Sequence, residues 1–580
     1  MDYSSTINLP KTDFSMKANL NEREPLFVKE WEASSLYRLL REKKKEKQKF
    51  ILHDGPPYAN GHIHLGHSLN KILKDIIVKY NNMLGRNASY VPGWDCHGLP
   101  IELQVVKTHH GQPLEKDALR KECREYARKF IEVQKDEFKR LGILGDWENP
   151  YTTMSEDYEK AIVDSFGRLV EKGYVYRALK PVYWCPSCET ALADAEVEYQ
   201  NHQTPSLYVK FGLKPNRIFK EKAFWLIWTT TPWTLPANVA ICLNPDEEYM
   251  AARTAQDEWR LFASKLKNTL KDKLGFEILE ERKLQKSDLG SLTAVHPFLE
   301  RDSRIVFDRY VTMDTGTGCV HIAPGHGYED YVIGLKEKLP VLSPVDSRGR
   351  FTQEVGISEW AGENVFKAND RIMETLKATN HLILVDKLEH QYPHCWRCKK
   401  PVIFRATWQW FLNVEKDGLR EKCLDSIKKV KWIPEWGIER IGNMLKERPD
   451  WCLSRQRAWG VPIPAFFCEE CGEVAMTSET IGFFSKMVEK QGVDIWFTMP
   501  AEKLLPDGFK CLKCGAQKFK KEQDILDVWF DSGVSHIAVL ENPRWKDLSS
   551  PADLYLEGSD QHRGWFQSSL IPSVALKGVP

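Results

Sequence analysis

The spacing of apolar residues predicts alternating strands and helices over the first 150 residues. Residues 50–53 (FILH) are typical of a short buried strand, and a loop rich in Gly and Pro follows over residues 54–61. Residues 88–91 predict a second strand. Between them we expect a helix that ends at Gly85, because apolar residues recur on one helical face at Leu69, Ile72, Leu73, Ile76, Ile77 and Tyr80. This βαβ unit implies a parallel sheet with ligands at the carboxyl ends of its strands.

The pattern changes after about residue 200. Segments 224–228, 239–243 and 304–311 are short and β-rich, with turn residues between them, which predicts an inserted β domain. A second, smaller insertion is predicted over about residues 445–525. The basic run 41–49 contains two Glu residues and predicts a solvated helix face, with RNA contact as the alternative.

The amino-acid composition excludes several classes of protein. The 580 residues include 82 Lys plus Arg and 81 Asp plus Glu, a formal net charge of +1. This balance excludes a strongly basic or acidic protein but leaves room for nucleic acid bound at a local patch. The mean hydropathy is −0.45, and neither a transmembrane run nor a signal peptide is evident in the sequence. We therefore expect a soluble, cytoplasmic, multidomain protein with no membrane association.

Eight of the 14 cysteines form C-x-x-C pairs, which in an intracellular chain favour zinc over disulfides. The pairs are Cys185/Cys188, Cys395/Cys398, Cys468/Cys471 and Cys511/Cys514. The last two pairs are close enough for a local zinc ribbon. The first two bracket the β insertion, and one shared zinc would tie its ends together. Such zinc is expected to be structural, because four thiolates leave no open coordination position; packing thiols or a redox pair are the alternatives.

The first candidate functional residues along the chain are His64 and His67, which belong to an H-x-G-H sequence after the Gly/Pro loop. Two imidazoles and a glycine at a helix N-terminus suit a polyphosphate. Imidazoles can also donate hydrogen bonds to oxygens that gain charge in a transition state. From these residues alone, a pair of capping or metal-binding histidines is the alternative.

Five blocks carry a resemblance to a known family. Residues 56–67 (PPYANGHIHLGH) resemble the "HIGH" signature of class I aminoacyl-tRNA synthetases. Residues 93–102 (GWDCHGLPIE) resemble the form in isoleucyl-tRNA synthetases rather than valyl or leucyl ones, and residues 557–566 (EGSDQHRGWF) resemble the adenylate-binding motif of the bacterial isoleucyl enzymes. Residues 454–460 (SRQRAWG) and 527–533 (DVWFDSG) match too. The chain thus resembles the N-terminal portion of bacterial-type isoleucyl-tRNA synthetases.

The resemblance implies a reaction and its partners. A carboxylate oxygen of isoleucine would attack the α-phosphate of ATP, which brings Mg²⁺, and the resulting isoleucyl-adenylate would pass to the isoleucine tRNA. No stable protein partner is implied. The implied site residues are His64 and His67 at the phosphates, Glu557, Gly558, Asp560 and Gln561 around the adenylate, Asp95 at the substrate ammonium, Pro56 lining the site, and Trp529 and Trp565 walling the aliphatic pocket. The role of Asp95 is also sound chemically, because a partly buried ammonium needs a carboxylate.

The same resemblance implies hydrolytic editing of mischarged valine. Isoleucine exceeds valine by one methylene, a difference known in this same enzyme family to give only ~1–3 kcal/mol, or roughly 10–200-fold discrimination. Residues 228–234 (WTTTPWT) and 315–331 resemble the family's editing strand and editing loop. The implied roles are ammonium binding by Asp330, placement of the ribose and water by His321 with Thr229, Thr230 and Thr231, and support of the pocket by Asn238. From the residues alone, three consecutive threonines predict an ordinary strand.

The expected fold is α/β: a Rossmann-type parallel-sheet catalytic domain interrupted by a β-rich editing insertion and a smaller zinc-ribbon-like insertion. The expected domains are 1–184, the first catalytic half with an N-terminal extension; 185–400, the editing insertion flanked by Cys pairs; 401–445, a return to the catalytic domain; 446–525, the second insertion; and 526–580, the second catalytic half. The family's Lys-Met-Ser-Lys-Ser loop and anticodon-binding domain would follow residue 580. We therefore expect an incomplete enzyme.

Other classes of function stay open. The chain could be a truncated paralogue that acts only as an aminoacyl-tRNA binding or editing module, although intact His64, His67, Asp95 and Glu557 argue against a non-catalytic binder. A zinc metallohydrolase is least expected, because four-Cys sites are closed and H-x-G-H lacks the H-E-x-x-H spacing.

Overall fold

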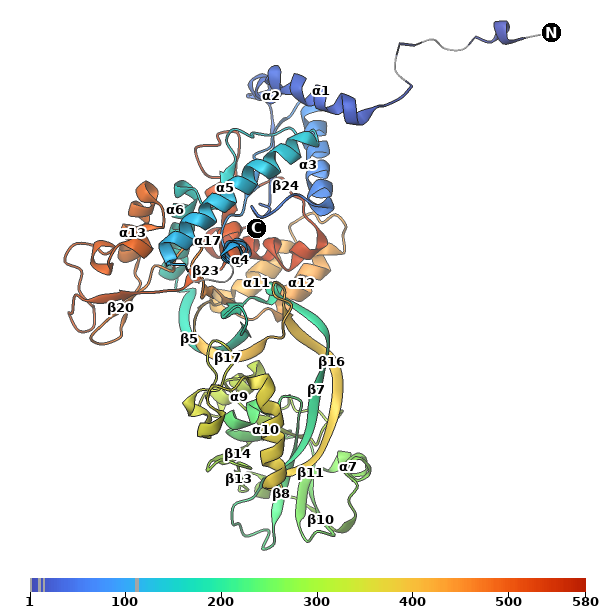
Figure 1. Ribbon diagram of the computed structural model, residues 1–580, viewed down its shortest axis with the longest axis vertical. Coiled ribbons are helices and arrows are strands. Elements are labelled where there is room, and N and C mark those ends of the chain that lie inside the picture. The colour runs from blue at the N-terminus through green and yellow to red at the C-terminus, as the bar shows by residue number, and fades with distance from the viewer. Residues whose placement is uncertain (1–2, 9–11, 14–15, 110–113) are drawn as a thin grey trace. The chain divides into compact units, whose positions relative to one another are not determined.

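The computed structural model describes residues 3–8, 12–13, 16–109 and 114–580. Its contacts divide the chain into two units, each assembled from separate stretches of sequence. Figure 1 colours these stretches along the chain. Among the described residues, no helix has both the length and the apolarity needed to cross a membrane. Unit 1 comprises Met1–Tyr174, Val414–Pro449 and Arg457–Pro580, and unit 2 comprises Val175–Asn413 and Asp450–Gln456.

Unit 1 contains a three-stranded parallel sheet in the order β2–β1–β24. β1 (Lys49–His53) pairs with β2 (Asn87–Ser89) on one side and with β24 (Leu554–Tyr555) on the other. α3 (Leu65–Met83) crosses over from β1 to β2 and is followed by Gly85 at φ 88°, so the predicted βαβ unit is confirmed. The chain leaves β1 toward β2, whereas β24 lies on the opposite side. The crevice between β1 and β24 is therefore a topological switch point, where α/β sheets bind ligands.

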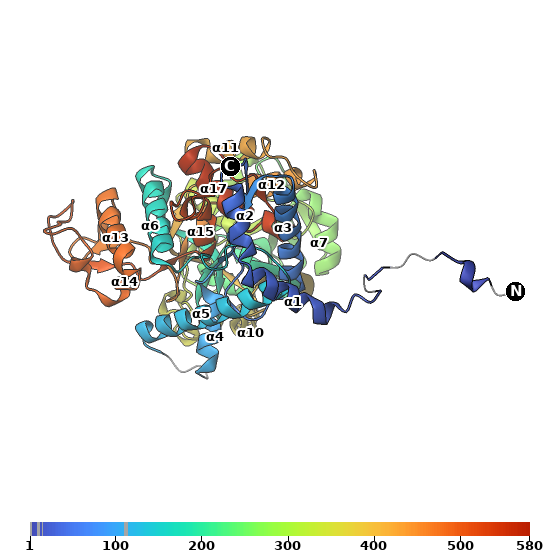
Figure 2. The same cartoon turned by 90° about the horizontal axis from the view of Figure 1, so that it is seen from above.

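Helices and short strands complete unit 1, and α6 and α13 lie side by side in both views (Figures 1 and 2). The helices are α1 (Leu20–Ala33), α2 (Leu36–Lys44), α4 (Leu99–Thr108), α5 (Lys116–Arg140), α6 (Glu156–Glu171), α11 (Leu419–Ile427), α12 (Gly437–Glu447), α13 (Ser478–Gln491), α14 (Ile495–Thr498), α15 (Val528–Gly533), α16 (Ser535–Ala538) and α17 (Trp565–Lys577). The remaining strands are β3 (Gly93–Trp94), β4 (Tyr151–Thr152), β20 (Phe466–Cys468), β21 (Val474–Ala475), β22 (Phe519–Lys521) and β23 (Ile525–Leu526). The basic run 41–49 is helical only at its start, because α2 ends at Lys44 and β1 begins at Lys49.

α3 reverses the usual orientation of an amphipathic helix. Its apolar residues share one face, as their spacing predicts, but that face is exposed: Leu69 is 64% exposed, Ile76 56% and Tyr80 60%. The buried face carries Lys71 and Lys74 instead, with Lys74 fully inaccessible. Periodicity identifies a common face, whereas the partners of the helix decide which face is buried.

Unit 2 is dominated by antiparallel strands. A six-stranded sheet has the order β12–β10–β11–β8–β7–β16, and two four-stranded sheets have the orders β13–β14–β9–β15 and β18–β17–β5–β6. The three segments predicted as short strands overlap β8, β9 and β14. β7 and β16 pair from Val197↔Cys395 to Val209↔Leu382 and form a long two-stranded ribbon (Figure 1). This ribbon holds the two ends of the intervening sequence together.

The remaining bounds in unit 2 follow. The strands are β5 (Val175–Cys185), β6 (Thr190–Leu192), β7 (Val197–Gly212), β8 (Ala223–Thr229), β9 (Ala240–Leu243), β10 (Tyr249–Thr254), β11 (Trp259–Ala263), β12 (Ile278–Lys283), β13 (Ala294–Val295), β14 (Asp302–Phe307), β15 (Cys319–Ile322), β16 (Leu382–Cys395), β17 (Ile403–Leu412), β18 (Trp451–Cys452) and β19 (Ser454–Arg455). The helices are α7 (Lys267–Leu274), α8 (Lys286–Leu289), α9 (Tyr328–Lys336) and α10 (Val365–Ala378).

The orientation of α3 predicts an unusual pair of mutational effects. Ile76→Ser should change the free energy of unfolding by no more than about 0.5 kcal/mol, because the side chain is exposed. Lys74→Met should lower it by about 3–5 kcal/mol, because two buried carboxylates lose a cation. Urea denaturation of both variants beside the parent measures the difference. A greater loss for Ile76→Ser would contradict the orientation.

Candidate functional site

His64 and His67 lie at the N-terminus of α3, just beyond the carboxyl end of β1. His64 caps the helix: its Nδ1 accepts a hydrogen bond from the N–H of His67 (3.3 Å), and the two rings stack with centroids 3.8 Å apart. A Cβ on Gly66 would lie 2.9 Å from the His64 ring, so a glycine between the histidines keeps this position open. Burial, and then the neighbouring His64, lower the pKa of His67 to about 4. The ring of His67 is therefore neutral at pH 7, and the positive end of the helix dipole lies beside it.

Glu557 lies on the other side of the switch point, two residues after β24. Its Oε1 accepts hydrogen bonds from the N–H of Gly55 (3.1 Å) and from Nζ of Lys74 (2.6 Å). Its Oε2 accepts one from the amide of Asn70 (2.9 Å). A Cβ on Gly55 would lie only 2.5 Å from Oε1, so glycine is required for this approach. The carboxylate thereby joins the loop after β24 to the loop after β1.

A buried ion network supports Glu557. Asp54, the first residue after β1, pairs with Lys71 and, at 2.7 Å, with Lys74. Burial acts to raise the pKa of Asp54, but the two ammonium groups outweigh it and lower the pKa to about 2. Neither lysine was predicted as a site residue from the sequence, because a polar helix face usually meets solvent. The available signal was an acid placed directly after the strand, opposite two lysines at i, i+3 spacing.

Asp95, directly after β3, lies against the same Gly/Pro loop. Its N–H donates to the carbonyl of Pro57 (2.8 Å), and its own carbonyl accepts from the N–H of Ala59 (2.9 Å). The hydroxyl of Thr153 donates to Oδ1 (3.2 Å). Burial raises the pKa of Asp95 well above its usual range, and the neighbouring Asp531 adds to the effect. A carboxyl group in this setting gains strongly from a cation.

The segment after β24 is held by its own side chains. Oε1 of Gln561 accepts from the N–H of Trp565 (3.0 Å), and its amide nitrogen donates to Asp560 (2.8 Å). The Trp565 ring is buried and stacks on Tyr555, with centroids 4.5 Å apart. A Cβ on Gly558 would lie 2.5 Å from Oδ1 of Asp560. This segment is therefore ordered around the position of Glu557.

Trp529 and Pro56 complete the set predicted for unit 1. The Trp529 ring comes so close to Gly564 that a Cβ there would lie 2.8 Å from it. Its Nε1 is buried without a hydrogen-bond partner among the described residues. Pro56 is half-buried and precedes Pro57, which binds Asp95. The structure thus gathers the predicted residues on the loops after β1, β3 and β24 and at α15.

In unit 2, part of the predicted editing set forms a hydroxyl–imidazole cluster. Nε2 of His321 lies 3.5 Å from Oγ1 of Thr229 and 3.2 Å from Oγ1 of Thr234. The N–H of Thr231 donates to Oγ1 of Thr229 (3.2 Å). Burial lowers the pKa of His321 to about 4, so its ring is neutral at pH 7. Thr234 was not predicted as a site residue; it lies in the same WTTTPWT sequence, one short turn further on.

Thr230 and Thr231 line a cavity of about 350 Å³. Asn369 and Asp370 of α10 also line this cavity. Oδ1 of Asn369 accepts a hydrogen bond from the N–H of Trp233 (3.1 Å), which fixes the threonine segment against that helix. The cavity provides space beside the hydroxyl groups.

Asp330 and Asn238 are held by backbone groups. Oδ2 of Asp330 accepts from the N–H of Ala323 (2.8 Å), and burial raises the pKa of the carboxyl to about 6. The amide of Asn238 donates to the carbonyl of Ala240 (2.8 Å), while its Oδ1 is buried with no hydrogen-bond partner among the residues that the structure describes. In the described parts of the chain, neither side chain hydrogen-bonds to the threonine–histidine cluster.

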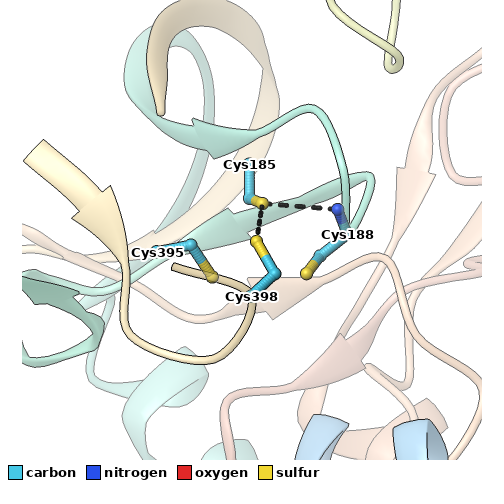
Figure 3. A group of neighbouring side chains, drawn as sticks. All are labelled: Cys185, Cys188, Cys395 and Cys398. Atoms are coloured by element: carbon cyan, nitrogen blue, oxygen red, sulfur yellow. Dashed lines mark hydrogen bonds between the residues drawn. The ribbon is translucent and has the colours of Figure 1, made fainter. Parts of the chain in front are cut away.

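Four cysteine sulfurs of unit 2 point toward one another from two loops (Figure 3). The loops follow β5 and β16, and the pairs Cys185/Cys188 and Cys395/Cys398 meet with all their sulfurs within 4.8 Å. The 3.5 Å between the sulfurs of Cys185 and Cys398 is too long for a disulfide of ~2.05 Å. It suits tetrahedral coordination, because metal–sulfur bonds of about 2.3 Å hold sulfurs about 3.8 Å apart.

A second cluster in unit 1 has the same form. Its closest pairs are Cys468 with Cys514 (3.5 Å) and Cys471 with Cys511 (3.6 Å). All four C-x-x-C turns of the chain share one backbone feature: the residue after the second cysteine is left-handed, at Glu189, Lys399, Gly472 and Gly515. Both donor sets therefore fit a metal ion held by thiolates.

Comparisons with known proteins show which sequences and structures the chain is similar to. The sequence profile described as "tRNA synthetases class I (I, L, M and V)" matches residues 26–580. The chain is 53% identical to the isoleucine–tRNA ligase of Kosmotoga olearia over 584 residues and 53% identical to that of Thermotoga petrophila over 586 residues. Each alignment covers 100% of this chain but 62% of the relative, so the chain spans about three fifths of the length of these relatives. A ternary complex of Agrobacterium radiobacter K84 agnB2 LeuRS with tRNA and LeuAMS matches at 18% identity and a TM-score of 0.43, covering 97% of this chain and 66% of that one.

Proposed function

The chain belongs to the class I tRNA synthetase family, and from this we propose that it activates isoleucine with ATP for transfer to the isoleucine tRNA. One observation carries the proposal. The loops after β1, β3 and β24 are joined by hydrogen bonds and place a histidine pair, Asp95 and Glu557 around one topological switch point. The 53% identity to isoleucine–tRNA ligases supports isoleucine as the amino acid.

The chemistry asks for position and charge stabilisation rather than a protein nucleophile. A carboxylate oxygen of isoleucine attacks the α-phosphorus of ATP, and the bond from that phosphorus to the oxygen bridging to the β-phosphate breaks, releasing pyrophosphate. His64 and His67 stand at the positive end of α3, where donors and the helix dipole stabilise charge that develops on the phosphoryl oxygens. ATP would carry Mg²⁺, which would neutralise part of the triphosphate charge.

The other residues hold the two substrates. Asp95 pairs with the ammonium of isoleucine, whose positive charge favours the ionised carboxylate and offsets the burial that raises the pKa of this group. Trp529, Trp565 and Pro56 enclose the aliphatic side chain. Glu557, Gly558, Asp560 and Gln561 hold the adenylate, with Glu557 anchored by Gly55 and Lys74.

Calorimetric titration with non-hydrolysable isoleucyl-, valyl- and leucyl-adenylate analogues tests this proposal. The isoleucyl analogue should bind more tightly than the valyl one by the roughly 10–200-fold known for this enzyme family, and clearly more tightly than the leucyl one.

Asp95→Asn should weaken binding of the isoleucyl analogue about 100-fold or more, because a buried ammonium loses its carboxylate. An analogue without the amino group is the matched control and should bind parent and variant alike. If the parent binds none of the analogues, the proposed synthetic site is wrong.

We further propose that unit 2 hydrolyses valyl-tRNA formed in error. Two observations support this: Thr230 and Thr231 line a cavity, and the neighbouring Thr229 lies 3.5 Å from the neutral imidazole of His321. The threonine hydroxyls and His321 place the terminal ribose and the attacking water. Asp330 receives the valyl ammonium, and Asn238 supports the pocket from behind.

Substitution of Asp330 separates the two activities. Asp330→Ala should leave ATP–pyrophosphate exchange at the parental rate but allow valyl-tRNA to survive. The carboxyl, with a pKa of about 6, is ionised above pH 6 and neutral below it, so the KM for valyl-tRNA in the parent should rise as pH falls through about 6. Glu329→Ala, which removes an adjacent exposed acid, is the control. Clearance of valyl-tRNA by Asp330→Ala at the parental rate would refute the assignment. Clearance by a parent that binds no adenylate would favour an editing-only module.

We also propose one structural zinc ion in each cysteine cluster. Four thiolates would complete the coordination and tie two loops together, so the metal stabilises the fold rather than taking part in a reaction. Metal analysis should find two zinc ions per chain. Cys188→Ser and Cys514→Ser should each reduce this to about one, whereas Cys423→Ser, a buried cysteine on α11, should leave two. Well under one zinc per chain would remove both assignments.

A further inference from the structure

One fully buried amide connects the loop after β1 to the loop that carries Asp95. Gln134 lies on α5 and is completely inaccessible. Its Oε1 accepts a hydrogen bond from the indole N–H of Trp94 (3.0 Å), the residue before Asp95. Its Nε2 donates to the carbonyls of Tyr58 (3.0 Å) and Gly61 (2.8 Å) in the Gly/Pro loop. Both N–H donors of the amide are thus used on one loop and its acceptor on the other.

The helix that carries Gln134 also holds the loop at two further points. The hydroxyl of Tyr126 donates to Oδ1 of Asn60 (2.8 Å). The carboxylate of Glu137 accepts from the N–H of Ile63 (2.9 Å) and contacts His62. Tyr126, Gln134 and Glu137 recur at offsets of eight and three, so they share one face of α5. The Gly/Pro loop is therefore fixed to a long helix along most of its path to His64.

The two loops already touch through their backbones, where Asp95 pairs with Pro57 and Ala59. Backbone contacts along a single line leave one loop free to rotate relative to the other about that line. The Gln134 amide adds a connection away from that line, between Trp94 and the carbonyls of Tyr58 and Gly61. Together the two connections fix both the separation and the relative orientation of the loops.

We propose that Gln134 is a positioning residue that sets the geometry between the phosphate-binding histidines and the ammonium-binding Asp95. The inference rests on the proposed synthetic function and deepens it. Isoleucine bound at Asp95 must present its carboxylate within about 3–3.5 Å of the α-phosphorus, so a small shift between the loops slows the reaction. Gln134 touches neither substrate and acts only through the loops.

Two substitutions test this role. Gln134→Glu keeps an oxygen that accepts from Trp94 but loses both N–H donors, and Gln134→Met loses all three hydrogen bonds. ATP alone and isoleucine alone should bind each variant within about threefold of the parent, because each loop retains its own contacts. The kcat of ATP–pyrophosphate exchange should fall roughly tenfold to hundredfold with little change in either KM. The isoleucyl-adenylate analogue, which spans both loops, should lose affinity about tenfold. Asp136→Asn, an exposed change on the same helix, is the control and should match the parent.

The outcomes separate positioning from a merely structural role. A lower melting temperature with unchanged kcat, KM and analogue affinity in the folded protein would overturn the proposal, and so would a rise in both KM values with kcat retained. If Gln134→Met does not fold, Gln134→Glu carries the test, because it preserves size and one hydrogen bond. Trp94→Phe removes the same link from the other side, so combining it with Gln134→Glu should cost less than the sum of the two changes. A parent that binds no adenylate analogue would refute the proposed function itself, and this inference with it.

Discussion

The candidate synthetic site depends on two ammonium groups buried beneath it. Lys71 and Lys74 neutralise Asp54 at the end of β1, and Lys74 also binds Glu557 just after β24. Buried charges are tolerated only when each has partners, so the four side chains keep one another in place. This network joins the two strands that flank the switch point. It also explains why α3 turns its polar face inward.

Both candidate sites use an imidazole that burial keeps neutral. The pKa of His67 and that of His321 are each lowered to about 4, with burial as the main cause in both. A neutral ring offers one donor and one acceptor without adding charge, and it keeps this character across the physiological range. Each unit therefore obtains a polar group that responds little to pH. Nδ1 of both rings is buried without a hydrogen-bond partner among the described residues.

Sequence patterns predicted elements better than orientation. The offsets from Leu69 to Tyr80 correctly predicted a helix between two parallel strands, but not that its apolar face would be exposed, because the partner of a helix is a tertiary property. The C-x-x-C spacing made the cysteine pairs visible in the sequence. That Cys188 lies close to Cys395 could not be predicted, because it depends on pairing between two strands that are far apart along the chain. Gln134 had no signal at all, since one amide within a highly charged helix belongs to no pattern. Thr234 was not predicted because it lies beyond Pro232 and Trp233, outside the run of three threonines.

The ribbon of β7 and β16, with a cysteine cluster at its base, brings the first and last residues of a long intervening sequence together. Between Gly212 and Leu382 the chain departs and returns at neighbouring points, so loop closure is already satisfied by the ribbon. The sequence between Gly212 and Leu382 can therefore be lengthened, shortened or exchanged as one unit during evolution. Such a change does not alter the path of the chain on either side of the ribbon. The hydrolytic specificity proposed for unit 2 can thus be exchanged by recombination at two neighbouring points of the chain rather than by gradual change of a whole protein.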